Sequence, residues 1–201
     1  MIREINNSEA LPGKNIILTI DFKLQKIIEN SFGGRRGGLV AIEPLTGEVL
    51  AFVSTPNFNP NSFIDGVDQK TWNNLNDSED KPLLNRPLKG LYPPGSTYKP
   101  FMALAALSSN SKDPNELIND PGYFILGNHK FRDSSQGGHG QVDMRKSIVV
   151  SSDTYYYKLA IGMGVDVIHK FISPFGFGQV TGIDLTGEAR GILPSSNWKL
   201  E

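Results

Sequence analysis

The hydrophobic residues of this chain come in short blocks separated by glycine, proline and small polar residues. The first block, residues 16–20, predicts a short strand. Asp21 can then cap a helix with apolar side chains largely on one side, namely Phe22, Leu24, Ile27 and Ile28. The glycine-rich stretch at 33–38 predicts the end of this helix.

Two near-continuous apolar runs, residues 39–42 and 49–53, flank the turn-forming sequence Pro-Leu-Thr-Gly-Glu. This pattern predicts a β-hairpin with cover on both faces. Residues 54–89 are rich in Asn, Asp and Pro and show little periodicity, which predicts a long irregular excursion. The rest of the chain predicts, in order, a buried helix at 101–107, a small hairpin at 123–131, a helical region at 144–163 and a short helix at 165–171.

Composition narrows the class of protein. The chain has 201 residues, 38% of them hydrophobic, so it can form one domain or part of a larger one. Its 20 Lys and Arg against 21 Asp and Glu argue against a basic nucleic-acid-binding face, and the lack of cysteine excludes disulfides and thiolate metal ligands. No apolar run approaches the roughly 18 residues of a membrane span, and the N-terminus lacks a signal-peptide pattern. Taken alone, the sequence predicts a soluble chain.

The stretch Tyr-Pro-Pro-Gly-Ser-Thr-Tyr-Lys-Pro at 92–100 is the first candidate for chemistry. Ser96 and Lys99 are expected in the first turn of the apolar helix, where residues three apart share a face. A lysine amine can activate a serine hydroxyl as a nucleophile when burial and neighbouring charge leave the amine neutral. Ser-x-x-Lys occurs four times, beginning at Ser78, Ser96, Ser109 and Ser196. Only Ser96 has a Pro-Pro-Gly lead-in and an apolar helix behind it.

Three motifs in order resemble the transpeptidase domain of class B penicillin-binding proteins. They are the stretch at 92–100, Ser-Ser-Asp-Thr-Tyr at 151–155 and Gly-Ile-Asp-Leu at 182–185. The likeness runs from about Leu18 to Trp198, and within the class it is strongest to the elongation-specific penicillin-binding protein 2 group. The resemblance implies an α+β fold of the penicillin-binding and serine β-lactamase type, with helices around an antiparallel sheet. It also implies that Ser96 is the acylated nucleophile and Lys99 its base.

The second motif supplies two further candidates, Ser151 and Asp153. Ser-x-Asn/Asp occurs five times, at Ser78, Ser108, Ser111, Ser151 and Ser195. Ser151 is selected because it follows Ser96 by 55 residues and continues as Asp-Thr-Tyr, as in the group resembled. We expect the motif at a bend between two helices, since Ser and Asp compete for backbone hydrogen bonds inside a helix. The resemblance implies that Ser151 can relay a proton, while Asp153 beside Lys99 favours the charged lysine.

The family's third motif, Lys-Thr-Gly or Lys-Ser-Gly, does not occur in the 201 residues. The resemblance therefore implies a domain that is incomplete at its C-terminus, with residues 1–15 as a linker and 16–201 as the N-terminal portion of the transpeptidase domain. The family's membrane anchor is expected before Met1, which places the whole protein at the periplasmic face of the bacterial inner membrane. In the family this third motif orients the substrate carboxylate, so we expect the chain by itself to be inactive.

The expected activity is peptidoglycan D,D-transpeptidation through a serine acyl-enzyme, without a cofactor. Expected partners are peptidoglycan stem peptides, β-lactams that imitate them and, for the full-length protein, other cell-elongation membrane proteins; nucleic acid is not expected. Two alternatives stay open. A β-lactamase or D,D-carboxypeptidase would share Ser96 and Lys99 but needs a base for a deacylating water. A scaffold without catalysis is favoured by the absent third motif.

Some close relatives have a zinc site of two aspartates, a histidine and a cysteine, and the matching positions here are Asp120, Asp133, His139 and Ser152. A serine in place of the thiolate leaves three hard or borderline ligands, which hold zinc much more weakly. We therefore predict no metal, and a histidine that makes structural hydrogen bonds. Zinc binding with Ser152 in place of cysteine is the alternative.

Overall fold

The computed structural model describes residues 13–200 and divides the chain into two compact units, residues 1–90 and 91–201. In the first unit, helix α1 (Phe22–Ser31) begins where expected. The Asp21 carboxylate accepts hydrogen bonds from the backbone N–H groups of Lys23 and Leu24, at 2.8 and 3.0 Å. These bonds satisfy amides that have no partner within the helix, which is why Asp21 ends the preceding coil and starts the helix.

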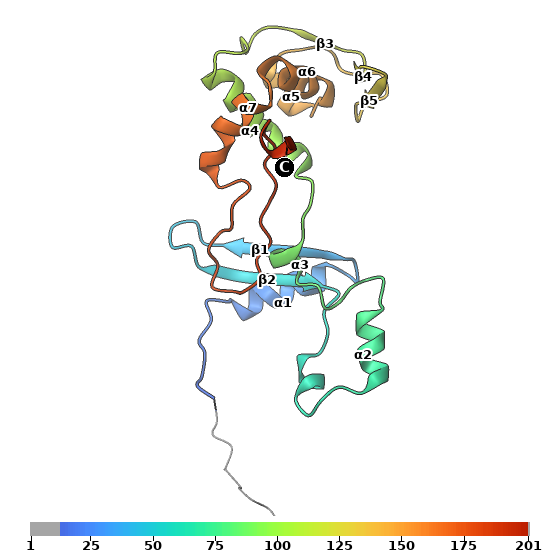
Figure 1. Cartoon of the computed structure of the whole chain (residues 1–201), viewed down its shortest axis with the longest axis vertical. Coiled ribbons are helices and arrows are strands. Elements are labelled where there is room, and N and C mark those ends of the chain that lie inside the picture. The colour runs from blue at the N-terminus through green and yellow to red at the C-terminus, as the bar shows by residue number, and fades with distance from the viewer. Residues whose placement is uncertain (1–12, 201) are drawn as a thin grey trace, which may run out of the picture. The chain divides into compact units, whose positions relative to one another are not determined.

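The predicted hairpin is confirmed, but cover on both of its faces is not, since Val40 and Ile42 of the first strand are 39% and 56% exposed. Strands β1 (Gly37–Ile42) and β2 (Val49–Thr55) pair antiparallel, with a register irregularity between Ala41 and Ile42. Helix α1 lies along this hairpin (Figure 1) and contacts β2. The Gln25 amide donates to the carbonyl of Phe52 at 3.1 Å and accepts from the Phe52 N–H at 2.8 Å. One helical side chain thus pairs backbone groups of β2 that β1 does not reach.

The predicted strand at residues 16–20 is wrong. Residues 13–20 form no regular element, and the side chain of Ile17 is 96% exposed. A strand needs a partner for its backbone, and this segment only touches β2: the Thr19 hydroxyl and the Asp21 N–H donate to carbonyls of Val49 and Leu50. The segment stays a coil because, among the described residues, no strand pairs with it.

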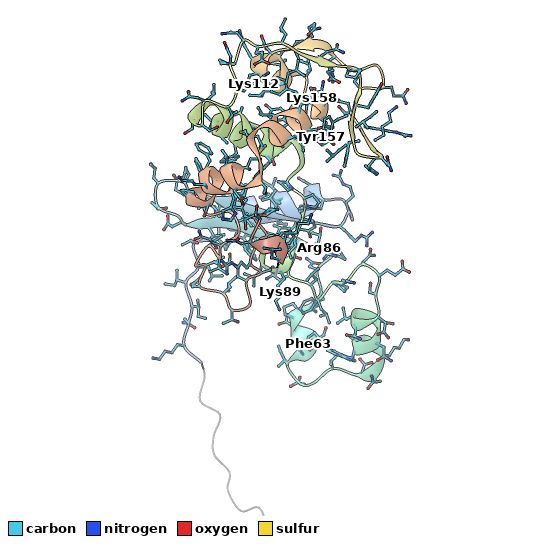
Figure 2. The ribbon with its side chains drawn as sticks, turned by 45° about the horizontal axis from the view of Figure 1, so that its top comes forward. Phe63, Arg86, Lys89, Lys112, Tyr157 and Lys158 are labelled. Atoms are coloured by element: carbon cyan, nitrogen blue, oxygen red, sulfur yellow. The ribbon has the colours of Figure 1, made fainter. Side chains whose placement is uncertain are left out.

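The excursion at 54–89 is more ordered than its composition predicts. It contains η1 (Pro60–Phe63), α2 (Gln69–Asn76) and α3 (Arg86–Lys89), and each begins after an Asn or Asp whose side chain caps it. Residues read as loop formers are therefore helix N-caps. Arg86, labelled in Figure 2, is buried, and its guanidinium donates to the carbonyls of Asp80 and Lys81 at 2.5 and 3.3 Å. Those bonds hold residues 80 and 81 against α3, the last element of the excursion.

The second unit is built from short helices and two small two-stranded antiparallel sheets. In chain order its elements are η2 (Gly95–Tyr98), α4 (Lys99–Ser108), β3 (Ile118–Asp120), β4 (Tyr123–Leu126), β5 (His129–Arg132), β6 (Gly140–Val142), α5 (Met144–Val149), α6 (Asp153–Met163), α7 (Val165–Ile172), η3 (Ser173–Phe175) and η4 (Trp198–Leu200). The β4–β5 hairpin and the helices at 144–163 and 165–172 confirm the sequence predictions, with a break at 150–152. The β3–β6 pairing was not predicted.

Helix α6 is the centre of this unit. It contacts α4, α5 and α7, and the β4–β5 hairpin lies beside it (Figure 1). Tyr157, labelled in Figure 2, packs its ring against Phe124 and Phe131 of that hairpin. On the other side Tyr155 and Ile172 are fully buried in the shared core. Within residues 13–200, no helix is both long and apolar enough to span a bilayer.

The core predicts a contrast between two isoleucines. Ile172→Ala should lower the free energy of unfolding by about 2–5 kcal/mol, because Ile172 is 0% exposed and its removal leaves a cavity. Ile161 of α6 is 58% exposed, so Ile161→Ala should change stability by less than about 1 kcal/mol. Urea unfolding of the purified chain measures both. Equal losses would contradict the assigned core.

Candidate active site

Ser96 and Lys99 lie where two kinds of helix join. Ser96 is in the 3₁₀ turn η2, and Lys99 begins α4, with its backbone N–H bonded to the Ser96 carbonyl. The sequence prediction placed both in one α-helical turn; the 3₁₀ turn instead eclipses positions i and i+3, which also directs them to one side. Gly95 has φ +57°, a left-handed conformation that glycine adopts without a side-chain clash, and Pro100 sits near the start of α4, where it needs no N–H.

The Lys99 ammonium group is the hub of the site. Lys99 is only 8% exposed, and its Nζ lies 2.6 Å from the Ser151 carbonyl oxygen, 2.9 Å from Ser151 Oγ and 2.6 Å from Asp153 Oδ1. These three acceptors match the three N–H donors of an ammonium. The ring of Tyr156 adds a cation–π contact, with Nζ 5.6 Å from the ring centroid. A buried charge is tolerated here because every donor is paired.

Ser151 connects the lysine to the exposed serine. Its Oγ accepts from Lys99 and donates to Ser96 Oγ at 2.8 Å. Within the described residues Lys99 makes its hydrogen bonds to Ser151 and Asp153, and Ser96 reaches it through Ser151. The result is a continuous chain of polar atoms from Ser96 through Ser151 to Lys99. All four predicted site residues therefore meet in one place.

Ser151 holds its position in an unfavourable backbone conformation. Helix α5 ends in a Schellman arrangement, in which the Ser151 N–H bonds to the carbonyl of Ile148 and the Ser152 N–H to that of Ser147. Ser151 takes the left-handed position, φ +56°, where glycine is usual. A residue with a Cβ costs roughly 1–2 kcal/mol there. Such strain persists where the surroundings enforce it, and here it directs Ser151 Oγ between Ser96 and Lys99.

A second polar cluster adjoins the motif at the N-terminus of α6. Ser152 is fully buried and caps α6: its Oγ accepts from the Tyr155 N–H and donates to Asp120 Oδ2 at 2.7 Å. Asp133 Oδ2 accepts from the Thr154 N–H at 2.7 Å. Carboxylates at a helix N-terminus are favoured by the helix dipole. The first turn of α6 is thus tied to two aspartates from other elements.

Both aspartates are held ionised. Asp120 is 1% exposed; its Oδ1 accepts from the Gly122 N–H and its Oδ2 from Ser152 and from His139 Nδ1, the latter at 2.8 Å. Burial works to raise the pKa of Asp120, but the hydrogen bonds from Ser152 and His139 outweigh it and lower that pKa to about 2. Burial also works to raise the pKa of Asp133, but hydrogen bonds from the backbone N–H groups of Thr154 and Ser135 leave that pKa below its usual value. Both carboxylates are charged near neutral pH.

These residues do not fit the zinc site that the resemblance implies. One potential ligand atom from each of Asp120, Asp133 and His139 lies within 4.8 Å of the others, as a cation site requires. The fourth position is the neutral hydroxyl of Ser152, and its proton and lone pair already bond to Asp120 and Tyr155. Each carboxylate oxygen of the two aspartates likewise has a protein hydrogen-bond donor. The Ser152 hydroxyl and all four carboxylate oxygens therefore have protein partners without an ion.

Sequence reasoning missed the parts played by Ser152, Thr154 and Tyr156. The sequence pointed to Ser152 only as a replacement for a cysteine ligand. The signal that was available for Ser152 is its place as the last residue before a helix, where serine is a preferred N-cap. No sequence pattern indicated that Asp133, 21 residues away, accepts from the Thr154 N–H.

Comparison with known proteins places this geometry in a family. A family model described as the penicillin binding protein transpeptidase domain matches residues 37–201. The chain is 45% identical over 202 residues to a protein of Acinetobacter baumannii named peptidoglycan D,D-transpeptidase MrdA, an alignment that covers 100% of this chain and 30% of that protein. The chain thus spans about a third of the length of the curated relatives it matches.

Solved structures share the fold. The crystal structure of Pseudomonas aeruginosa PBP2 in complex with WCK 5153 is 50% identical, with a TM-score of 0.85 over 94% of this chain and 43% of that one. The PBP2 in a complex with MreC from Helicobacter pylori is 38% identical, with a TM-score of 0.84 over 90% and 34%. These matches confirm the expected mixed α and β fold of the transpeptidase type. This chain belongs to the penicillin-binding protein transpeptidase family.

Proposed function

We propose that the chain is the N-terminal portion, residues 16–201, of the transpeptidase domain of a peptidoglycan D,D-transpeptidase, preceded by a linker at residues 1–15. The observation that carries the proposal is the hydrogen-bonded chain from Ser96 Oγ through Ser151 Oγ to Lys99 Nζ. It offers an exposed hydroxyl to a large substrate and keeps the base buried. A further C-terminal segment with a Lys-Thr-Gly or Lys-Ser-Gly motif completes the site in this proposal.

The reaction begins when Ser96 Oγ attacks the carbonyl carbon between the two terminal D-alanines of a stem peptide. For this step the Lys99 ammonium has first lost one proton to solvent. The Ser96 proton then passes to Ser151 Oγ as Ser151 gives its own proton to the neutral Lys99 amine. The C–N bond then breaks, the proton returns through Ser151 to the departing nitrogen, and D-alanine leaves an ester on Ser96. An amine of a second stem peptide attacks that ester, and the same groups move its proton, which restores Ser96 and forms the cross-link.

The site favours a transpeptidase over the related hydrolases. A hydrolase needs a second base to activate a deacylating water. In residues 13–200 the carboxylate that reaches the Ser96 and Lys99 pair is Asp153, and its Oδ1 is 2.6 Å from Lys99 Nζ. Because Asp153 already accepts a hydrogen bond from Lys99, it is a poor base for water. The reaction with a β-lactam is therefore expected to stop at a long-lived acyl-enzyme. The scaffold alternative predicts no acylation at all.

The proposal extends to location and partners. The whole protein acts at the periplasmic face of the inner membrane, on peptidoglycan stem peptides, and works with other cell-elongation membrane proteins. Support for such a partner is the Helicobacter pylori structure of PBP2 with MreC. No cofactor takes part in the steps described, because a serine, a relay hydroxyl and an amine suffice for acyl transfer.

Ser96 should be the acylated residue. In the completed domain, mass spectrometry after penicillin treatment should show one adduct on the peptide that contains Ser96, and Ser96→Ala should abolish it. Ser109→Ala is the matched control, since Ser109 also begins a Ser-x-x-Lys sequence but bonds to carbonyls of α4, and its adduct should be unchanged. An adduct that survives in Ser96→Ala would contradict the assignment.

Lys99 should be the base. In the completed domain Lys99→Arg should slow acylation by at least about 10²–10⁴-fold, because a guanidinium stays protonated and cannot accept the proton. Asp153→Asn should be much milder, since an amide oxygen can still accept from Lys99. Stopped-flow acylation rates with a chromogenic cephalosporin, alongside circular dichroism as a folding control, measure both. Equal losses would assign Asp153 a chemical role of its own.

The 201-residue chain by itself should acylate far more slowly than the completed domain. Loss of a single oxyanion-hole donor typically costs about 10²–10³ in rate, and loss of substrate-positioning groups costs more. Labelling of both proteins with a fluorescent penicillin, at equal concentration and over the same times, compares them. Stoichiometric labelling of the 201 residues at a similar rate would show that the third motif is not needed.

A further inference from the structure

The segment that begins α6 binds two different sets of partners in alternation. The side chains of Ser151 and Asp153 bond to Lys99, at 2.9 and 2.6 Å from its Nζ. Ser152 and Thr154, which alternate with them, are both 0% exposed, and they bond to other residues, Ser152 through its hydroxyl and Thr154 through its backbone N–H. In this short stretch, whatever fixes Ser152 and Thr154 also fixes the two groups that hold Lys99.

What fixes them is a pair of carboxylates. Asp120, at the end of β3, accepts from Ser152 Oγ at 2.7 Å, and Asp133, just after β5, accepts from the Thr154 N–H at 2.7 Å. Both aspartates also accept from backbone amides, Asp120 from the Gly122 N–H and Asp133 from the Ser135 N–H. The carboxylates therefore form a rigid clamp on the first turn of α6.

The two carboxylates help to keep Ser151 in its strained backbone conformation. The left-handed conformation of Ser151 is held from one side by the carbonyls of Ser147 and Ile148 at the end of α5. From the other side it is held through Ser152 and Thr154. If the second side is released, the segment can relax toward an ordinary backbone conformation, which would move Ser151 Oγ away from its place between Ser96 and Lys99.

We propose that Asp120 and Asp133 are positioning residues for the Ser96 and Lys99 pair, and that they act through direct hydrogen bonds to Ser152 and Thr154, without a metal ion. Neither aspartate touches the reacting atoms. Their effect reaches the chemistry through the geometry of Ser151 and Asp153. The inference rests on the proposed function for its kinetic consequence, but its structural part concerns Lys99 alone.

Asp133→Ala in the completed domain is the central test. It removes the acceptor for the Thr154 and Ser135 N–H groups and leaves the bonds of Asp120 to Ser152 and His139 in place, whereas a change at Asp120 would break both of those bonds directly. Misplacement of reacting groups by about 1 Å can cost about 100-fold, so the acylation rate constant should fall between about tenfold and 100-fold. The dissociation constant for the β-lactam should stay within about threefold. Asp133→Asn keeps one acceptor oxygen and should recover most of the rate.

Lys158→Met is the matched control. Lys158, labelled in Figure 2, also ties α6 to β3, by donating from its Nζ to the Asn119 carbonyl at 2.8 Å. It does not contact Ser152 or Thr154 in the hydrogen bonds of the described residues. Lys158→Met removes a tie of α6 to β3, the strand that carries Asp120, and should leave the acylation rate unchanged. A fall equal to that of Asp133→Ala would mean that general loosening of α6, and not the clamp, controls the rate.

A second readout does not depend on acylation. With ¹⁵N-labelled lysine, the buried and fully bonded Lys99 ammonium should give a slowly exchanging N–H signal, assigned by its loss in Lys99→Arg. Asp133→Ala should broaden or abolish this signal and Lys158→Met should preserve it. Ser152→Gly, which keeps an acceptable helix N-cap but lacks the hydroxyl, serves as the second clamp variant if Asp133→Ala does not fold.

The outcomes separate the two proposals. A wild-type domain that shows the Lys99 signal but is never acylated would overturn the proposed function and leave the clamp supported if Asp133→Ala loses the signal. An unchanged Lys99 signal in a folded clamp variant overturns the clamp. Metal analysis of the purified wild type should find well under one equivalent of zinc, with acylation insensitive to a chelator. Stoichiometric zinc, with slower acylation after its removal, would overturn the metal-free part.

Discussion

The buried ammonium group of Lys99 is the constraint on which the site depends. Burial of a charge is costly unless each of its hydrogen-bonding groups is paired, and Lys99 has three acceptors from Ser151 and Asp153. Since Lys99 begins α4 and the acceptors precede or begin α6, this one group joins the two helices that contribute to the active site. The geometry of the motif is therefore coupled to the packing of α4 against α6 in the core.

Ser96 and Lys99 differ sharply in their exposure to solvent. Ser96 lies at the surface, whereas Lys99 is almost entirely covered. The Ser151 hydroxyl spans the distance between them, so in the proposed mechanism a base shielded from water can still receive the proton of the nucleophile. The strained backbone at Ser151 is the structural cost of placing a hydroxyl at this point.

Much of the site could be inferred from sequence because its parts are local. Proline and glycine before an apolar helix set up Ser96 and Lys99, the bend at 150–152 follows from Ser and Asp between helical stretches, and Asp21 caps α1 as predicted. Local patterns failed where pairing decides the outcome. Residues 16–20 have strand composition but no partner strand among the described residues, and Asn and Asp in the excursion cap helices that they seemed to exclude.

The sequence by itself thus determined the candidate nucleophile and base, the order of the motifs and most of the helices, because each depends on residues close together in the chain. Only the tertiary structure decided that Ser151 stands between Ser96 and Lys99, and that Asp120 and Asp133 bind the first turn of α6. Those contacts join residues 21–55 positions apart, and their geometry follows from how the helices and small sheets pack. Hydrogen bonds over such separations carry no periodic signal along the chain, so only the folded structure reveals them.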